Sequence, residues 1–120
     1  MSEAPENPMR PAGMCHGAGH ILVYGNPALK ARFGESCVGM PAREGLLDLP
    51  RNAFTLLDAV LVRAKPLARW IQFDGGDWRM TAAPAIDPGT GEVYGVRFHL
   101  RARDDAPVRP VEMSESLPGE

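Results

Sequence analysis

The apolar residues of this chain follow two spacings, which predict strands near both ends of the central block and helices between them. From Val96 to Leu100 every second residue is apolar and the residues between are basic, the period of a strand with one covered face. Phe54, Leu57 and Leu61 are three and four residues apart, the spacing of one helix face. A long helix over 51–64 should therefore pack on a sheet.

The same patterns predict the remaining elements of the block. Glycine-rich turns at 17–19 and 74–77 and a longer turn at 84–91 separate the apolar runs. The region 34–50 is punctuated by glycine and proline, with room for one or two single-turn helices near 42–47. We expect strands over 13–16, 20–24, 67–73, 78–83 and 92–103, and a short helix over 26–33.

The start of the short helix has a clear local signal. Asn26 can accept a backbone N–H at the helix start, and Pro27 at the first helical position loses no needed donor. The long helix should end before Pro66, because proline disfavours helical geometry in the residue before it.

Three short motifs follow one another along the block. They are Gly25-Asn-Pro-Ala-Leu after the second strand, residues 78–84 before an Asp-x-x-Thr-Gly-Glu turn, and Gly91-Glu-Val-Tyr-Gly-Val-Arg97 at the last strand. In this order and spacing they resemble the PAS domain family, small sensory modules of signalling proteins. The resemblance spans nearly all of 13–103. It implies an α+β fold, with a five-stranded antiparallel sheet of order 2-1-5-4-3 and helices packed over one face.

Length and charge fit one soluble domain with two polar extensions. At 120 residues, 44% of them hydrophobic, the chain can build a single core. We expect a disordered N-terminal segment at 1–12, a PAS-like domain at 13–103 and an acidic disordered tail at 104–120. The tail has five carboxylates against one arginine, net −4, whereas 13–103 has 11 basic and 8 acidic residues, net +3. That surplus is too small and scattered to indicate nucleic acid.

If sheet and helices enclose a pocket, apolar residues should form its walls and a few polar groups should point inward. A core filled by its own side chains is the alternative. The predicted pocket residues are Val23, Asn26, Met40, Leu57, Leu61, Ile71, Arg79, Thr81 and Phe98.

The outer face of the sheet is the second predicted site. Aromatic side chains and methionine beside arginine are typical of protein interfaces. PAS domains commonly dimerise through this face, so the resemblance implies a homodimer, with a tryptophan covered by residues 9–16 as the alternative. The predicted interface residues are Trp70, Trp78, Met80, Tyr94, Arg97 and His99.

No catalytic or metal-binding constellation stands out. His16, His20 and His99 lack further ligands at a recognisable spacing, so we expect three partly exposed histidines and no metal. Haem-binding PAS domains typically place the axial histidine on the long helix, which has none here. Glu35-Ser-Cys37-Val-Gly differs from the Asn-Cys-Arg-Phe-Leu-Gln motif of flavin photoreceptors. Haem and flavin are both disfavoured, and the cofactor stays unknown.

The sequence favours a cytoplasmic, non-enzymatic signalling module. It has no secretory signal, no membrane span and two cysteines without a metal or redox spacing. The sequence given contains no kinase, cyclase or DNA-binding segment, so we expect a stand-alone domain whose output comes from a separate signalling protein or from oligomerisation. One interpretation is a sensor that binds a small molecule or protein partner and transmits the change through its sheet face. The alternative is a ligand-free dimerisation or interaction module.

Overall fold

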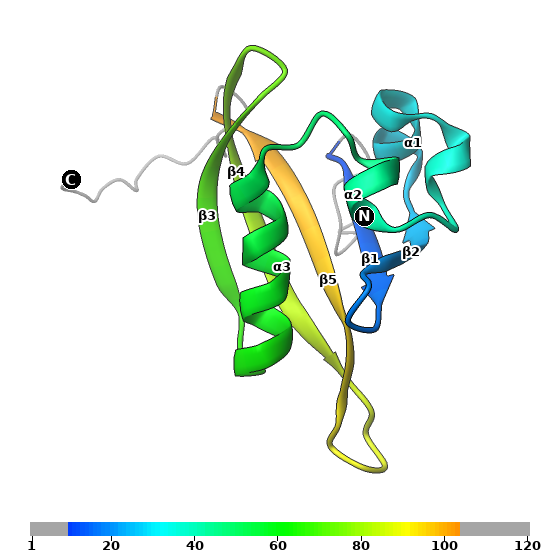
Figure 1. The fold of residues 1–120 in the computed structure, drawn as a ribbon. Helices are drawn as coiled ribbons and strands as arrows, with labels where there is room; N and C mark the ends of the chain where they lie inside the picture. The colour runs from blue at the N-terminus through cyan, green and yellow to red at the C-terminus, as the bar shows by residue number, and fades with distance from the viewer. Residues whose placement is uncertain (1–9, 104–120) are drawn as a thin grey trace, which may run out of the picture.

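The structure is a computed structural model that describes residues 10–103. Five strands and four helical segments follow one another there (Figure 1). In chain order they are β1 (Ala12–His16), β2 (Ile21–Gly25), α1 (Pro27–Phe33), the 3-10 turn η1 (Glu35–Cys37), α2 (Ala42–Gly45), α3 (Arg51–Arg63), β3 (Leu67–Phe73), β4 (Gly76–Ile86) and β5 (Val93–Ala102).

All five strands form one antiparallel sheet in the order β2-β1-β5-β4-β3, as predicted. The last strand in sequence, β5, occupies the centre and pairs with β1 on one side and β4 on the other. Ala12 faces His99 across one of these pairs, and Thr81 faces His99 across the other. The fold class α+β is confirmed.

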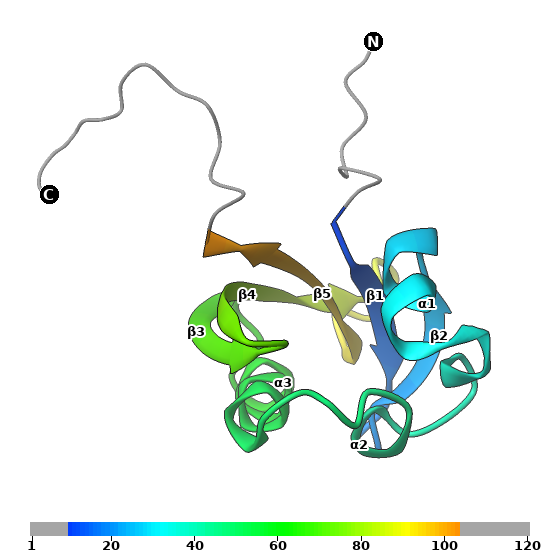
Figure 2. The ribbon, with the colours of Figure 1, turned by 90° about the horizontal axis from the view of Figure 1, so that it is seen from above.

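The helices cover one face of this sheet (Figure 2). The buried side of α3 consists of Ala53, Phe54, Leu56, Leu57 and Val60. It belongs to one continuous core with the apolar residues of β3, β4 and β5, and Leu22 and Leu29 extend that core under α1. We call the helix-covered side the inner face and the opposite side the outer face.

The capping signal of α1 is confirmed. Asn26 accepts a hydrogen bond from the backbone N–H of Leu29, at 2.9 Å, and Pro27 occupies the first turn. The same Asn26 oxygen accepts the N–H of Ala12 at 3.0 Å, and its amide donates to the carbonyl of Arg10 at 2.8 Å. Asn26 therefore also holds the start of β1 against α1.

Several element bounds differ from the prediction by one to three residues, and two of these differences concern the N-terminal segment and β4. Residues 10–12, expected in the N-terminal disordered segment, lie within the described part, and β1 begins at Ala12. Strand β4 continues through Pro84 to Ile86, whereas we expected a turn from residue 84. Strand β3 pairs with β4 only as far as Ala82. The later part of β4 therefore has β5 as its single pairing partner and tolerates a proline. The expected disorder at 1–9 and 104–120 falls outside the described residues.

Candidate functional site: the outer face of the sheet

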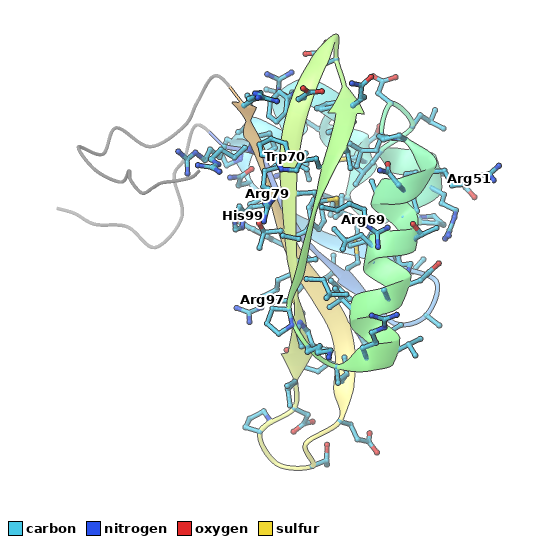
Figure 3. All side chains as sticks on the ribbon, turned by 90° about the vertical axis from the view of Figure 1, so that its left-hand side faces the viewer. Arg51, Arg69, Trp70, Arg79, Arg97 and His99 are labelled. Atoms are coloured by element: carbon cyan, nitrogen blue, oxygen red, sulfur yellow. The ribbon has the colours of Figure 1, made fainter. Side chains whose placement is uncertain are left out.

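Strand alternation decides which side chains reach the outer face. In β4, Trp78, Met80 and Ala82 are buried on the inner face, so Arg79 and Thr81 point the opposite way. Figure 3 shows Trp70, Arg79, His99 and Arg97 on the side of the sheet away from α3, whereas Arg69 points toward α3. None of the helices in residues 10–103 covers the side on which these four residues lie (Figure 2).

The registers align the outer-face residues in rows across the strands. Met14 faces Arg97 and Arg97 faces Ala83, which makes one row. Ala12, His99 and Thr81 form the next in the same way. A third row joins Arg101, Arg79 and Trp70. Small residues therefore lie toward the middle of the face, with arginine beside them.

The small side chains leave a shallow hollow of about 460 Å³ in the middle of this face. Arg10, Arg97 and His99 contribute its basic side chains. The remaining lining is mostly apolar: Ala12, Gly13, Met14, Tyr24, Thr81, Ala82, Ala83 and Phe98. The hollow can accept an apolar group accompanied by negative charge.

Trp70 anchors the other end of the outer face. Its side chain is 45% exposed, and the guanidinium carbons of Arg79 and Arg103 lie 5.4 and 5.8 Å from its ring centroid. A second hollow of about 600 Å³ runs beside it, with Asp77 and Arg101 in its lining. An exposed indole with two guanidinium groups near its ring is a combination that protein interfaces favour.

The outer face carries more positive than negative charge. Among residues 10–103, Asp77 contributes a carboxylate to this face, and it accepts hydrogen bonds from Arg103, at 3.3 Å, and Gln72, at 2.9 Å. Within residues 10–103, no carboxylate forms an ion pair with Arg79, Arg97 or Arg101. The face is therefore suited to an acidic partner.

Comparison with known proteins identifies the fold. No family model matches the chain, and a search of curated proteins finds no match. The PAS domain of the histidine kinase ThkA superposes with a TM-score of 0.63 at 15% identity, over 77% of this chain and 98% of that one. A sensory box sensor histidine kinase from Vibrio cholerae gives 0.65 at 13% identity, over 82% and 83%. The chain has the PAS fold.

A third similar structure is VqmA of Vibrio cholerae in a complex with ligand and DNA. Its TM-score is 0.63 at 18% identity, and the match covers 82% of this chain and 48% of that one. Folds similar to this one therefore occur in sensor histidine kinases and in a protein determined in complex with DNA.

The predicted pocket residues do not come together as one cavity in this PAS fold. Leu57, Ile71 and Phe98 are buried in the core, and Leu61 packs against it. Met40 is half-buried and Val23 is 50% exposed. Asn26 is buried, but its side chain serves the backbone around α1 and β1.

Four face assignments in β4 were wrong. Arg79 and Thr81, predicted to point into a pocket, lie on the outer face. Trp78 and Met80, predicted at the interface, are 7% and 0% exposed in the core. The pairing gives the reason: Trp70 faces Arg79 and Ile71 faces Trp78, so the two tryptophans are on opposite sides of the sheet. Trp78 packs instead on Phe73, with ring centroids 5.1 Å apart.

The other predicted interface residues are exposed. Trp70, Arg97 and His99 lie on the outer face (Figure 3). Tyr94 is also exposed and lies beside His16, with ring centroids 6.2 Å apart, where the β4–β5 register is irregular. Their part in binding stays a prediction.

Sequence reasoning missed a part-buried polar contact between the helices and the β1–β2 turn. His20, expected to be partly exposed, is 1% exposed, and its Nε2 lies 2.6 Å from Oδ1 of Asp58 in α3. Arg43 of α2 donates to the other Asp58 oxygen at 3.2 Å. Burial acts to raise the pKa of Asp58, but hydrogen bonds from His20 and Arg43 outweigh it and lower the pKa below its ordinary 3.8. The sequence does contain one signal for this contact. Asp58 lies at helical spacing from Phe54 and Leu61, so a carboxylate is expected beside the apolar face of the long helix.

Several further features bear on what this site can do. In residues 10–103 no three histidine, cysteine or acidic side chains are grouped as metal ligands would be. Cys15 and Cys37 are buried free thiols, and burial raises the pKa of Cys15 to about 12. The described helices include none with the length and apolar character needed to cross a membrane.

Proposed function

We propose that this chain is a signalling module of the sensory PAS type that binds a protein partner through the outer face of its sheet. The observation that carries the proposal is Trp70, exposed beside two arginines on a face that the described helices leave open. We infer that the partner presents an acidic and partly apolar surface, because Arg79, Arg97 and Arg101 have no carboxylate partner within residues 10–103.

A protein partner has more support than a small molecule held inside the domain. Leu57, Ile71 and Phe98, three of the proposed pocket walls, pack directly in the core. Both hollows that touch the outer face are open to solvent and lined partly by arginine. We therefore infer that the signal passes through contact between a partner and this face, rather than through a small molecule bound between the sheet and the helices.

A homodimer through this face is less favoured than an acidic partner. An isologous dimer brings the same patch of two copies together, and here each copy would contribute the same arginines. Like charges across an interface cost free energy and reduce the association rate. We accordingly place the second copy among the outcomes of the test.

We further propose a non-enzymatic, cytoplasmic role. Asp58 contacts the imidazole of His20 and the guanidinium of Arg43. Neither of these contacts involves a hydroxyl or a thiol, so this group does not activate a nucleophile. The two buried free cysteines fit a reducing compartment.

A peptide selection tests the partner chemistry. Twelve-residue random peptides would be selected on the full chain and counter-selected on Arg97→Glu, with Arg51→Glu on the helix side as the matched charge reversal (Figure 3). We expect enrichment of acidic peptides that retain binding to Arg51→Glu and lose it with Arg97→Glu. Amide NMR shifts should then change at Thr81, Ala83 and His99. Peptides without acidic residues, or shifts confined to α3, would refute the proposal.

Sedimentation equilibrium examines the second copy directly. With an acidic partner, the chain alone should stay monomeric at micromolar concentration. A stable dimer that Trp70→Ala dissociates would make a second copy the occupant instead.

A further inference from the structure

We propose that the acidic segment 104–120 of the same chain docks reversibly on the outer face and competes there with the partner. This inference rests on the proposed function for its consequence, but the docking itself can be tested alone. It assigns to the segment the regulation of the binding face.

The charges of the two parts are complementary. The described residues 10–103 hold twelve arginine and lysine and eight acidic side chains, net +4 with histidine neutral. Three of the arginines on the outer face lack a carboxylate partner there. The segment has five carboxylates against Arg109, net −4. Its apolar residues match the mostly apolar lining of the central hollow: Val108, Val111, Met113 and Leu117.

The segment also begins at the right place. It follows Arg103, which lies against Trp70 on the outer face and lines the hollow beside it. Strand β5, which leads to it, is the central strand. Ten residues of β5 span roughly 33 Å, and 17 extended residues reach up to about 56 Å, so every part of the face is accessible.

The expected contact is weak, and this makes it suitable for regulation. Ion pairs between exposed side chains are weak, because water and salt screen them. A tethered segment nevertheless acts at a local concentration of the order of millimolar. The segment would therefore cover the face when no partner is present and yield to a partner that also engages Trp70.

A spin label on the segment tests the docking in the full chain. Ser116→Cys provides a single reactive thiol, because Cys15 and Cys37 are buried. We expect the label to broaden the amide signals of Thr81, Ala83 and Arg97 far more than those of α3. The broadening should fade between 0.05 and about 1 M NaCl, as the Debye length falls to about 3 Å.

The matched control keeps the tether and removes the charge. It adds Asp104→Asn, Asp105→Asn, Glu112→Gln, Glu115→Gln and Glu120→Gln to the labelled chain. Loss of the broadening supports the proposal, whereas equal broadening with and without the carboxylates overturns it. Broadening only between a spin-labelled chain and a separate isotope-labelled chain makes a second copy the source, which also overturns it. Contact from a Ser2→Cys label, with none from Ser116→Cys, would assign the face to residues 1–9 instead.

Competition separates this inference from the proposed function. Selected acidic peptides should bind the neutralised-tail chain roughly tenfold more tightly than the wild type, since the tethered competitor is lost. Equal affinity, together with no broadening, would overturn the docking and leave the proposed function standing. If the label broadens the outer-face signals but no acidic peptide binds, the proposed partner is refuted and the docking of the segment is still supported.

Discussion

Nε2 of His20 lies 2.6 Å from Oδ1 of Asp58, and this contact joins the β1–β2 turn to α3 across 38 positions of sequence. His20 Nδ1 is buried without a hydrogen-bond partner in the described part. The side chain is therefore held by one polar contact, and the position depends on Asp58.

The coupling between His20 and Asp58 should be measurable. A double-mutant cycle with His20→Ala and Asp58→Ala should give an interaction free energy of about 1 to 2 kcal/mol, since the hydrogen bond involves a charged group that is partly exposed. Urea unfolding of the four proteins provides the values. An interaction near zero would mean that the contact contributes nothing to stability.

Acid should weaken the same contact. The folded-state pKa of Asp58 lies below its ordinary 3.8, so its stabilising contribution is present above about pH 4 and is lost as the pH falls through the folded-state pKa. The free energy of unfolding should therefore fall less steeply from pH 5 to pH 2 in Asp58→Asn than in the wild type. Glu92→Gln, in the exposed β4–β5 turn, should keep the wild-type slope. Parallel slopes for all three proteins would contradict the prediction.

Cys15 should behave as an inert thiol. Burial raises its pKa from 9.0 to about 12, so the protonated thiol stabilises the fold below pH 9, and this contribution is lost as the pH rises toward 12. Ellman's reagent at pH 8 should react slowly with the native chain and promptly with both cysteines in urea. Rapid reaction of the native chain would show that Cys15 or Cys37 is accessible.

Asn26 should be sensitive to substitution. Asn26→Ala removes the acceptor for the N–H groups of Ala12 and Leu29 and should cost about 2 to 4 kcal/mol, since both donors are buried. Asn26→Asp retains that acceptor and loses the donor to the carbonyl of Arg10. It should therefore cost less than the alanine variant. Thermal unfolding would rank the two, and the reverse order would refute the assignment.

The two tryptophans should respond in opposite ways. Trp78→Ala should destabilise the fold by about 3 to 5 kcal/mol, because it empties a packed position between Phe73 and the guanidinium of Arg32. Trp70→Ala should change stability by less than about 1 kcal/mol and abolish binding of acidic peptides. Unfolding curves and peptide titrations of both variants check this. Equal destabilisation would contradict the assigned faces.

The sequence predicted the elements better than their faces. The period of α3, the alternation in β5 and the Asn26 cap are local signals, and all three are present in the structure. The β4 sequence also contains the information about its faces, because Trp78, Met80 and Ala82 alternate with Arg79 and Thr81. The prediction grouped the aromatic residues on the outer face instead, and this assigned the side chains of β4 to the wrong faces of the sheet.

Contacts between distant segments were less predictable. His20 follows a glycine-rich turn, where a histidine is usually exposed, and its partner lies in another element. The bulk of Leu57, Ile71 and Phe98 did not reveal whether they line a cavity or fill it, because that depends on how closely α3 approaches the sheet.

The central position of β5 has a consequence for synthesis. Until the ribosome has released residues up to Ala102, β1–β2 and β3–β4 can form only as separate hairpins, each with an edge that awaits the same strand. Isolated hairpins are marginally stable in water, and unpaired edges favour association with other chains. The nascent protein therefore gains its sheet in one late step, and this is the stage at which a chaperone would be most useful to it.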